Sequence, residues 1–191
     1  MSDLTPLTAL GGAEPARLTL GALTLTENAD LALASLALRR DSIVGSGRPA
    51  PLGLDLPDPG GWVGLQGVGA FWTSPGQWMI EAEEAAGGDF AALVKTAAPD
   101  CSVTEQTDAW VAFEVTSSQG AGPLVGLLEK LANLDADLFG PGQATRTAIE
   151  HMSCYIIRRA EDRLAILGMR TLANSLWHTL TQAASRLQRA A

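Results

Sequence analysis

Cysteine is scarce in this sequence. The chain has 191 residues and two cysteines, Cys101 and Cys154, which lie 53 positions apart and form no CxxC pair. Two distant cysteines build neither a disulfide framework nor a four-thiolate zinc site. Free thiols are typical of a reducing compartment, so we expect a cytoplasmic protein.

Long apolar runs are missing too. The longest such stretch, residues 31–38, is interrupted by Ser35, and it is far shorter than the roughly 20 residues that a membrane-spanning helix needs. Residues 1–13 lack a basic region followed by an apolar core, the pattern of a secretory signal. We expect a soluble protein with no membrane partner.

Positive charge is in deficit. Thirteen Lys and Arg stand against 21 Asp and Glu, a formal net charge of −8, which would repel a phosphate backbone, so no nucleic-acid partner is expected. The last part of the chain differs, because from Arg146 onward seven arginines face three acids. The seven are Arg146, Arg158, Arg159, Arg163, Arg170, Arg186 and Arg189. They either seat an acidic partner or form the solvated side of a strand and a helix, and we favour the second interpretation.

Apolar residues are abundant. They make up 47% of the chain, charged residues only 18%, and there are five Trp, with a mean hydropathy of +0.13. A chain of this length buries about 70% of its extended surface, so it can form a sizeable core without metal or disulfides. So little charge also suggests apolar surface reserved for a partner.

The first half of the chain predicts few regular elements. Residues 1–30 show no sustained period and read as an irregular N-terminal arm. A strand is expected over residues 31–40. A hairpin follows over residues 62–72 and 77–83, because Pro75-Gly76 suits a type II turn. Asp89 caps a helix whose expected apolar face is Phe90, Leu93 and Val94.

The second half repeats this order. The alternation over residues 110–115 predicts a half-buried strand, with Ala112 and Glu114 on its outer side. Pro123 opens a helix, a hairpin spans residues 145–158 and 164–169, and Thr171 caps a terminal helix. The sequence therefore predicts an α+β fold of two β-α-β-β-α-like halves, mainly antiparallel sheet faced by helices. We expect one domain over residues 31–191, with halves 31–100 and 101–191.

Motifs that carry chemistry are absent from the sequence. It has no GxxxxGK[ST], no GxGxxG and no GxSxG. His151 and Cys154 form a lone HxxC pair expected to point to opposite faces of a strand, and His178 has no recognisable setting. The carboxylates Glu81, Glu83, Glu84 and Asp89 read as a solvated strand end rather than an acid–base pair. We therefore assign no catalytic, cofactor-binding or metal-binding residue.

Three segments together resemble the gamma subunit of heterotetrameric sarcosine oxidase. FWTSPGQWMI at residues 71–80 is similar to the family's Trp-x-x-Pro-x-x-Trp-Leu hairpin, and CSVTEQTDAW at 101–110 resembles its Ser-Val-Thr-Asp-Gln-Ser run. The third runs from ATRT at 144–147 through Arg158-Arg159 to MRTLANSLW at 169–177, similar to the family's Arg-Ser-x-x-x-Ser-Leu-Trp ending. The resemblance covers roughly residues 60–185 and rests on the order and spacing of these segments. Residues 42–61 and the N-terminal arm depart from it.

The resemblance implies a fold related to the aminomethyltransferase folate-binding domain. It also implies a noncatalytic, structural subunit that packs on the large alpha subunit of a complex that oxidatively demethylates sarcosine to glycine. The FAD, FMN, NAD, tetrahydrofolate and zinc of such a complex are expected in its other subunits, with none in this chain.

Two alternatives remain open. The first is a free-standing folate-binding or aminomethyltransferase-like protein, in which Trp110 would supply an aromatic wall and Asp108 or Glu114 a carboxylate for a pterin. The second is a homo-oligomeric structural protein.

Overall fold

The computed structural model describes residues 6–39 and 48–190 and divides the chain into two compact units. The terminal unit comprises Met1–Ala29, Ala109–Pro141 and Arg146–Ala191. The central unit comprises Asp30–Asp108 and Gly142–Thr145. Each unit combines an antiparallel sheet with helices, so the predicted α+β class is confirmed.

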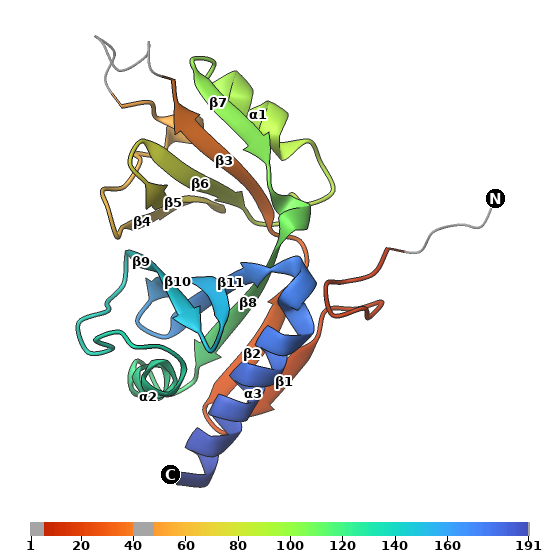
Figure 1. Ribbon diagram of the computed structural model, residues 1–191, viewed down its shortest axis with the longest axis vertical. Helices are drawn as coiled ribbons and strands as arrows, with labels where there is room; N and C mark the ends of the chain where they lie inside the picture. Colours follow the sequence, from red (N-terminus) through yellow and green to blue (C-terminus); the bar gives the residue numbers. More distant parts are fainter. Residues whose placement is uncertain (1–5, 40–47, 191) are drawn as a thin grey trace, which may run out of the picture. The chain divides into compact units, whose positions relative to one another are not determined.

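The first sheet has six strands in the order β1-β2-β8-β11-β10-β9 (Figure 1) and belongs to the terminal unit except for the first three residues of β9. They are β1 (Arg17–Leu20), β2 (Leu23–Asn28), β8 (Trp110–Ser117), β9 (Gln143–Ile149), β10 (Met152–Ala160) and β11 (Arg163–Met169). Strand β8 lies between β2 and β11 and runs antiparallel to both. Val115 of β8 therefore stands between Leu25 and Leu164 in one row of the sheet.

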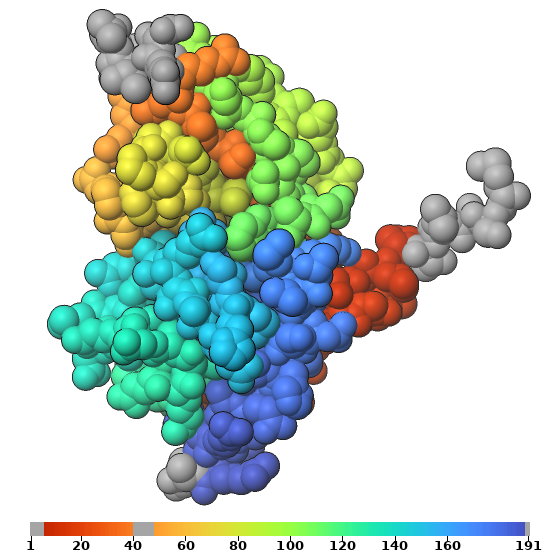
Figure 2. Space-filling model, viewed as in Figure 1, coloured from red at the N-terminus to blue at the C-terminus, as the bar shows by residue number. Residues whose placement is uncertain are grey.

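Two helices pack on one face of this sheet. In α2 (Gly122–Leu131), Pro123 occupies the first turn and four leucines are buried: Leu124, Leu127, Leu128 and Leu131. Helix α3 (Ala173–Ala190) follows a 3-10 turn at Arg170–Leu172, so Thr171 lies in that turn and the α-helix begins one residue later than a Thr171 cap implies. Both helices form one core with Val111, Phe113 and Val115 of β8. In the space-filling view the dark-blue end of α3 lies at the surface (Figure 2), where Arg186 and Arg189 are exposed.

The sheet of the central unit has five strands in the order β4-β5-β6-β3-β7. They are β3 (Ala32–Leu38), β4 (Trp62–Leu65), β5 (Val68–Ser74), β6 (Gln77–Ala82) and β7 (Cys101–Glu105). Strands β5 and β6 form the predicted hairpin through Pro75-Gly76, and Gly76 has the positive φ, 69°, that such a turn requires. The single strand expected over residues 62–72 is instead two, because Gln66 and Gly67 both have positive φ and turn the chain.

Helix α1 (Phe90–Ala97) completes the central unit. Asp89 caps it as predicted, since its carboxylate accepts the Ala92 amide at 2.9 Å. Phe90 and Val94 are buried in the core of this unit, but Leu93, predicted to share their face, is 55% exposed. The prediction for Leu93 is wrong because the core of this unit includes Phe90 and Val94 but leaves Leu93 outside it.

The irregular arm expected over residues 1–30 is wrong for residues 17–28, which form a hairpin. Arg17–Leu20 and Leu23–Asn28 are strands that pair with each other, and β2 also pairs with β8. Glu27 anchors the residues before them, because its buried carboxylate accepts the amides of Leu10 and Ala16 at 3.0 and 3.1 Å. Residues 1–5 of the expected arm, and residue 40 of the strand expected over 31–40, lie outside the described residues.

The boundary between the halves also differs from the expected 100/101. Residues 101–108 belong to the central unit, and residues 1–29 join the terminal unit. The cause is strand pairing, since β7 pairs with β3 and β2 pairs with β8. Within the described residues no helix is long and apolar enough to cross a lipid bilayer.

The hairpin turn gives a test of this fold. Gly76→Ala should lower the free energy of unfolding by about 1 kcal/mol, because an L side chain is strained at positive φ. No backbone atom crowds the position, where a Cβ would meet only Leu38 side-chain atoms at 3.8 Å. The measurement is urea denaturation.

Gly122→Ala is the matched control. That glycine lies in the first turn of α2, its φ is not positive, and an added Cβ meets nothing within 4 Å. Its stability should be unchanged or slightly raised. Equal losses in the two variants would contradict the turn assignment.

Candidate functional site

Glu114 lies on the sheet face of the terminal unit that is opposite the two helices. Its two carboxylate oxygens accept hydrogen bonds from Nε of Arg159 and Nε of Arg163, each at 3.1 Å. Glu114 is 8% exposed, and a buried carboxylate of this kind is tolerated only when it is paired. The half-buried strand predicted here is therefore wrong: Ala112 and Glu114 on the outer side of β8 are buried as well.

An aromatic pair occupies the same face. The rings of Trp110 and Tyr155 lie 5.3 Å apart at a tilt of 52°. The guanidinium of Arg146 stands 5.7 Å from the Tyr155 ring and donates from Nε to the Ser153 hydroxyl at 2.9 Å. Burial raises the pKa of Tyr155, and the Arg146 charge partly opposes that rise. These groups form a packed surface held by cation–π and ring contacts.

Two of the three residues considered for a pterin, Trp110 and Glu114, are not gathered into one slot. Trp110 and Glu114 share a face of β8 but stand four residues apart, about 13 Å along a strand. Glu114 is engaged by the two arginines. Asp108 belongs to the central unit, exposed in a 3-10 turn at Thr107–Ala109.

The arginine-rich segment does not form one solvated face. Arg186 and Arg189 are exposed on α3, whereas the Arg159 side chain is only 7% exposed. Arg158 is 2% exposed and donates from Nη2 to the Glu161 carbonyl. Its Nε and Nη1 have no hydrogen-bond partner within the described residues. Burial lowers the pKa of Arg158, while the charges of Glu161 and Asp162 oppose that effect. The favoured prediction of a solvated side is wrong for Arg158 and Arg159.

The histidines and cysteines are dispersed. His151 lies in the exposed turn between β9 and β10, rather than on a strand, and His178 is exposed on α3. Cys154 is buried in the core of the terminal unit and Cys101 in that of the central unit. Across residues 6–39 and 48–190, no group of three or more His, Cys, Asp or Glu is arranged to hold a metal ion.

Burial determines the chemistry of both thiols. It raises the pKa of Cys154 to about 11, against a small opposing effect of the Ile149 amide. Burial also raises the pKa of Cys101, although the nearby positive charge of Lys95 acts to lower it. A thiol with a raised pKa holds little of the nucleophilic thiolate at neutral pH.

The acidic cluster of residues 81–89 separates into two parts. Glu81 is buried, and one of its oxygens accepts Nε1–H of Trp62 at 2.7 Å. Glu83, Glu84 and Asp89 are exposed on the loop that leads into α1. This separation does not offer a pair of carboxylates poised on one substrate.

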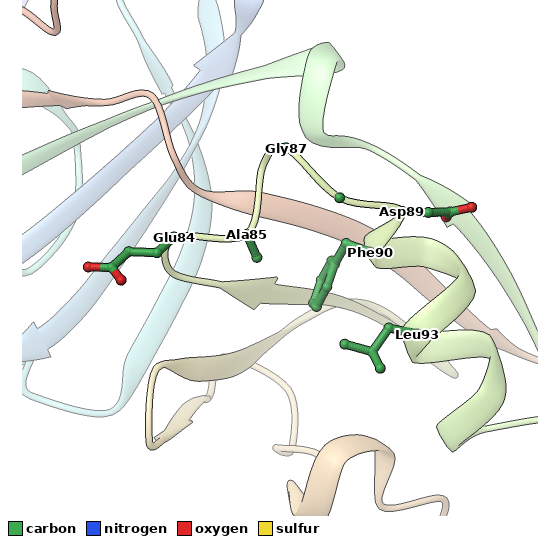
Figure 3. Close-up of a pocket in the computed structure, with 7 residues that line it drawn as sticks. Glu84, Ala85, Gly87, Asp89, Phe90 and Leu93 are labelled. Carbon is green, nitrogen blue, oxygen red and sulfur yellow. The ribbon is translucent and has the colours of Figure 1, made fainter.

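A hollow of about 310 Å³ lies between this loop and α1. Its lining residues are Glu84, Ala85, Gly87, Gly88, Asp89, Phe90 and Leu93. Figure 3 shows Ala85, Phe90 and Leu93 pointing toward the same space, while the carboxylates of Glu84 and Asp89 are directed away from it on opposite sides. The hollow therefore has an apolar floor and an acidic rim.

The start of α1 is closed to anions by carboxylates of the chain itself. Asp89 accepts the Ala92 amide, and Oε2 of Glu105 accepts the Ala91 amide at 3.1 Å. Burial works to raise the pKa of Glu105, but hydrogen bonds from Thr107, Ala91 and Gln106 outweigh it and hold the pKa below its usual value. A helix start usually attracts anions, so its occupation by two carboxylates makes the surroundings of the hollow negative.

A second hollow, of about 350 Å³, belongs to the terminal unit. It lies among the β1–β2 turn, the start of α2 and the end of α3, and its lining is mostly apolar. Neither hollow was predicted from the sequence. The one available signal was Leu93, an apolar residue next to an acidic, glycine-rich loop.

The comparisons with known proteins concern the fold. The sequence matches no protein-family model and no curated protein. A chain of heterotetrameric sarcosine oxidase from Corynebacterium sp. U-96, in complex with pyrrole 2-carboxylate, aligns with a TM-score of 0.66 and 21% identity over 90% of this chain and 88% of that chain. Aminomethyltransferase T of the glycine cleavage system from Bartonella henselae aligns with a TM-score of 0.59 and 16% identity over 82% of this chain and 44% of that chain. This chain shares their fold. The predicted relation to the aminomethyltransferase fold is thereby confirmed.

The buried thiols give a testable prediction. At pH 8, a thiol with a pKa of about 11 is only about one-thousandth thiolate. Cys154 should therefore resist Ellman's reagent in the native protein and react at once in denaturant. Cys101→Ser isolates Cys154 for this measurement. Rapid labelling of the native variant would contradict its burial.

The Glu105 contacts predict a pH dependence of stability. Because the folded-state pKa lies below the unfolded one, the charge stabilises the fold above the unfolded pKa of about 4.3, and this stabilisation is lost as pH falls through the folded value. Glu105→Gln should cost about 1 kcal/mol at pH 7, the usual size of a lost helix cap, and nothing at strongly acidic pH. Urea titrations over a pH series measure the difference.

Glu129→Gln, exposed on α2, serves as the control and should follow the wild type at every pH. A Glu105→Gln deficit that stays constant down to acid pH would show that the charge of Glu105 is not what stabilises α1.

Proposed function

We propose that this chain is the small, noncatalytic subunit of a sarcosine oxidase complex, corresponding to the gamma subunit, and that it packs on the large alpha subunit. The main support is the likeness to a chain of heterotetrameric sarcosine oxidase over most of both chains. The two coverages imply chains of nearly equal length, which supports a match to a whole subunit rather than to a part of a larger one. The segments at residues 71–80, 101–110 and 144–177 support the same assignment.

The contacts of the acidic side chains agree with a structural role. Glu114 neutralises Arg159 and Arg163, Glu81 accepts the Trp62 indole, and Glu105 caps α1. Each of these carboxylates is held by groups of its own unit, so its interactions stabilise the fold. In this proposal the chain covers apolar surface on a larger subunit and contributes no reacting group.

The complex would convert sarcosine, oxygen and water to glycine, formaldehyde and hydrogen peroxide, with tetrahydrofolate able to take the formaldehyde as methylenetetrahydrofolate. FAD, FMN, NAD, tetrahydrofolate and zinc would be held by the other subunits, in the cytoplasm. This chain would act by keeping the alpha subunit soluble, through an interface of about 1,600 Å² or more.

Co-expression tests the proposal. The tagged chain, expressed with the products of the reading frames next to its own gene, should co-purify with a flavin-containing large subunit, and the complex should release hydrogen peroxide from sarcosine. Without this chain the large subunit should lose solubility. A complex that assembles, stays soluble and turns over normally in its absence would overturn the scaffold role.

The alternative is a free-standing folate-binding protein, favoured by the likeness to aminomethyltransferase T. This chain spans less than half of that enzyme, and Trp110 and Glu114 are separated along β8 as described above. Calorimetric titration with tetrahydrofolate separates the two functions, because the subunit proposal expects no heat from the isolated chain. Light scattering tests the homo-oligomer, which would form a stable dimer without a partner.

A further inference from the structure

The hollow between residues 84–89 and α1 combines an apolar floor with exposed apolar surface. Phe90 forms part of its floor, and Leu93 is among the most exposed large apolar side chains of the described residues, at 55%. Leaving a leucine side chain exposed to water is unfavourable. A partner's apolar side chain that covered Leu93 and filled the hollow would remove this apolar surface from water and so favour binding. A volume of about 310 Å³ is at the lower limit of small-molecule pockets, and it suits one or two apolar side chains of a protein.

Charge decides what kind of partner fits. The central unit contains eleven acidic and four basic residues, so it accounts for −7 of the chain's net −8. Glu84 and Asp89 stand on the rim of the hollow, and Glu105 lies at the start of α1. The nearest basic group along α1, Lys95, is turned to the other end of the helix, where its amine donates to the carbonyls of Pro99 and Cys101.

The helix start does not favour an anion either. Its Ala91 and Ala92 amides already bind Glu105 and Asp89, so the groups that usually attract a phosphate or carboxylate are occupied. An acidic segment or an anionic ligand would meet only negative charge at this rim. A segment that carries both basic and apolar side chains is favoured twice: its charges are attracted to the acidic rim, and its apolar side chains pack on the floor.

We propose that this hollow is a docking site for a basic, apolar segment of a partner protein. In that segment a leucine-like side chain enters against Phe90 and Leu93, and flanking Lys or Arg side chains face Glu84 and Asp89. The proposal deepens the proposed function, on which it rests, because it places one contact of the partner subunit on the central unit.

The direct test uses a synthetic peptide in which lysine and leucine alternate, titrated into the isotope-labelled full chain and followed by nuclear magnetic resonance. Shift changes should concentrate on residues 84–93. Leu93→Arg should weaken binding at least about 10-fold, as loss of a central contact does, and Glu84→Gln about 2- to 5-fold. Raising the salt from low to physiological concentration should weaken it further.

Matched controls distinguish binding at this site from nonspecific binding of the peptide. Leu138→Arg makes the same change at another exposed leucine, in the terminal unit, and should leave binding intact. A peptide with glutamate in place of lysine should not bind. Equal binding of the acidic peptide, or shift changes that spread away from residues 84–93, would overturn the proposal. Since Leu93 is exposed, Leu93→Arg should retain the wild-type circular dichroism spectrum.

The co-expressed complex distinguishes this inference from the proposed function. If the wild-type chain assembles with the flavin-containing subunit and Leu93→Arg lowers the recovered complex while Leu138→Arg does not, both stand. If the two variants assemble equally well, the docking site is wrong and the subunit role remains. If the wild type forms a dimer by itself that Leu93→Arg abolishes, the occupant is a second copy and the proposed partner is wrong.

Discussion

Pairing of buried carboxylates is the constraint on which most of this structure depends. A carboxylate removed from water must be matched by donors or by positive charge. Glu114 meets two arginines, Glu27 two backbone amides and Glu81 an indole. These bonds fix β8 to β10 and β11, the N-terminal residues to β2, and β4 to β6. Side chains that could serve catalysis in another protein here hold strands in place.

The parts of the fold that the sequence predicted correctly have local causes. Asp89 before an apolar helix, Pro123 in a first turn and Pro75-Gly76 between two strands each determine the backbone within a few residues. The hairpin of β1 and β2 also had a local signal, since leucine and threonine alternate on both sides of Gly21-Ala22, and Gly21 has positive φ. Each alternating run is short, and Pro15 and Gly21 interrupt the pattern, so it does not amount to a sustained period over residues 1–30.

The hollow beside α1 and the contacts of Glu114 with its two arginines have non-local causes, and the sequence could not predict them. The Glu114 contacts depend on the register between β8 and β11. That register brings Arg159 and Arg163 beside Glu114, although they are 45 and 49 positions away in the sequence. The Glu105 cap depends on where β7 lies relative to α1. The exposure of Leu93 depends on how much of α1 the sheet covers. The helical period places Leu93 near the apolar face of α1. Only the packing of the helix on its sheet decides whether a residue at the edge of that face is covered or exposed to solvent.

The pairing of β2 with β8 has a consequence for how the chain acquires its structure during synthesis. Leu23 pairs with Ser117, and β8 then pairs with β11, close to the C-terminus. Most of the central unit is one continuous stretch, Asp30–Asp108, so it can form its local contacts while the ribosome is still translating. Strand β2 cannot pair with β8 until residues 110–117 have been synthesised. Pairing between strands so far apart in the sequence is slow. Until β8 has been synthesised, the edge of β2 that will pair with it therefore carries backbone groups without their strand partner.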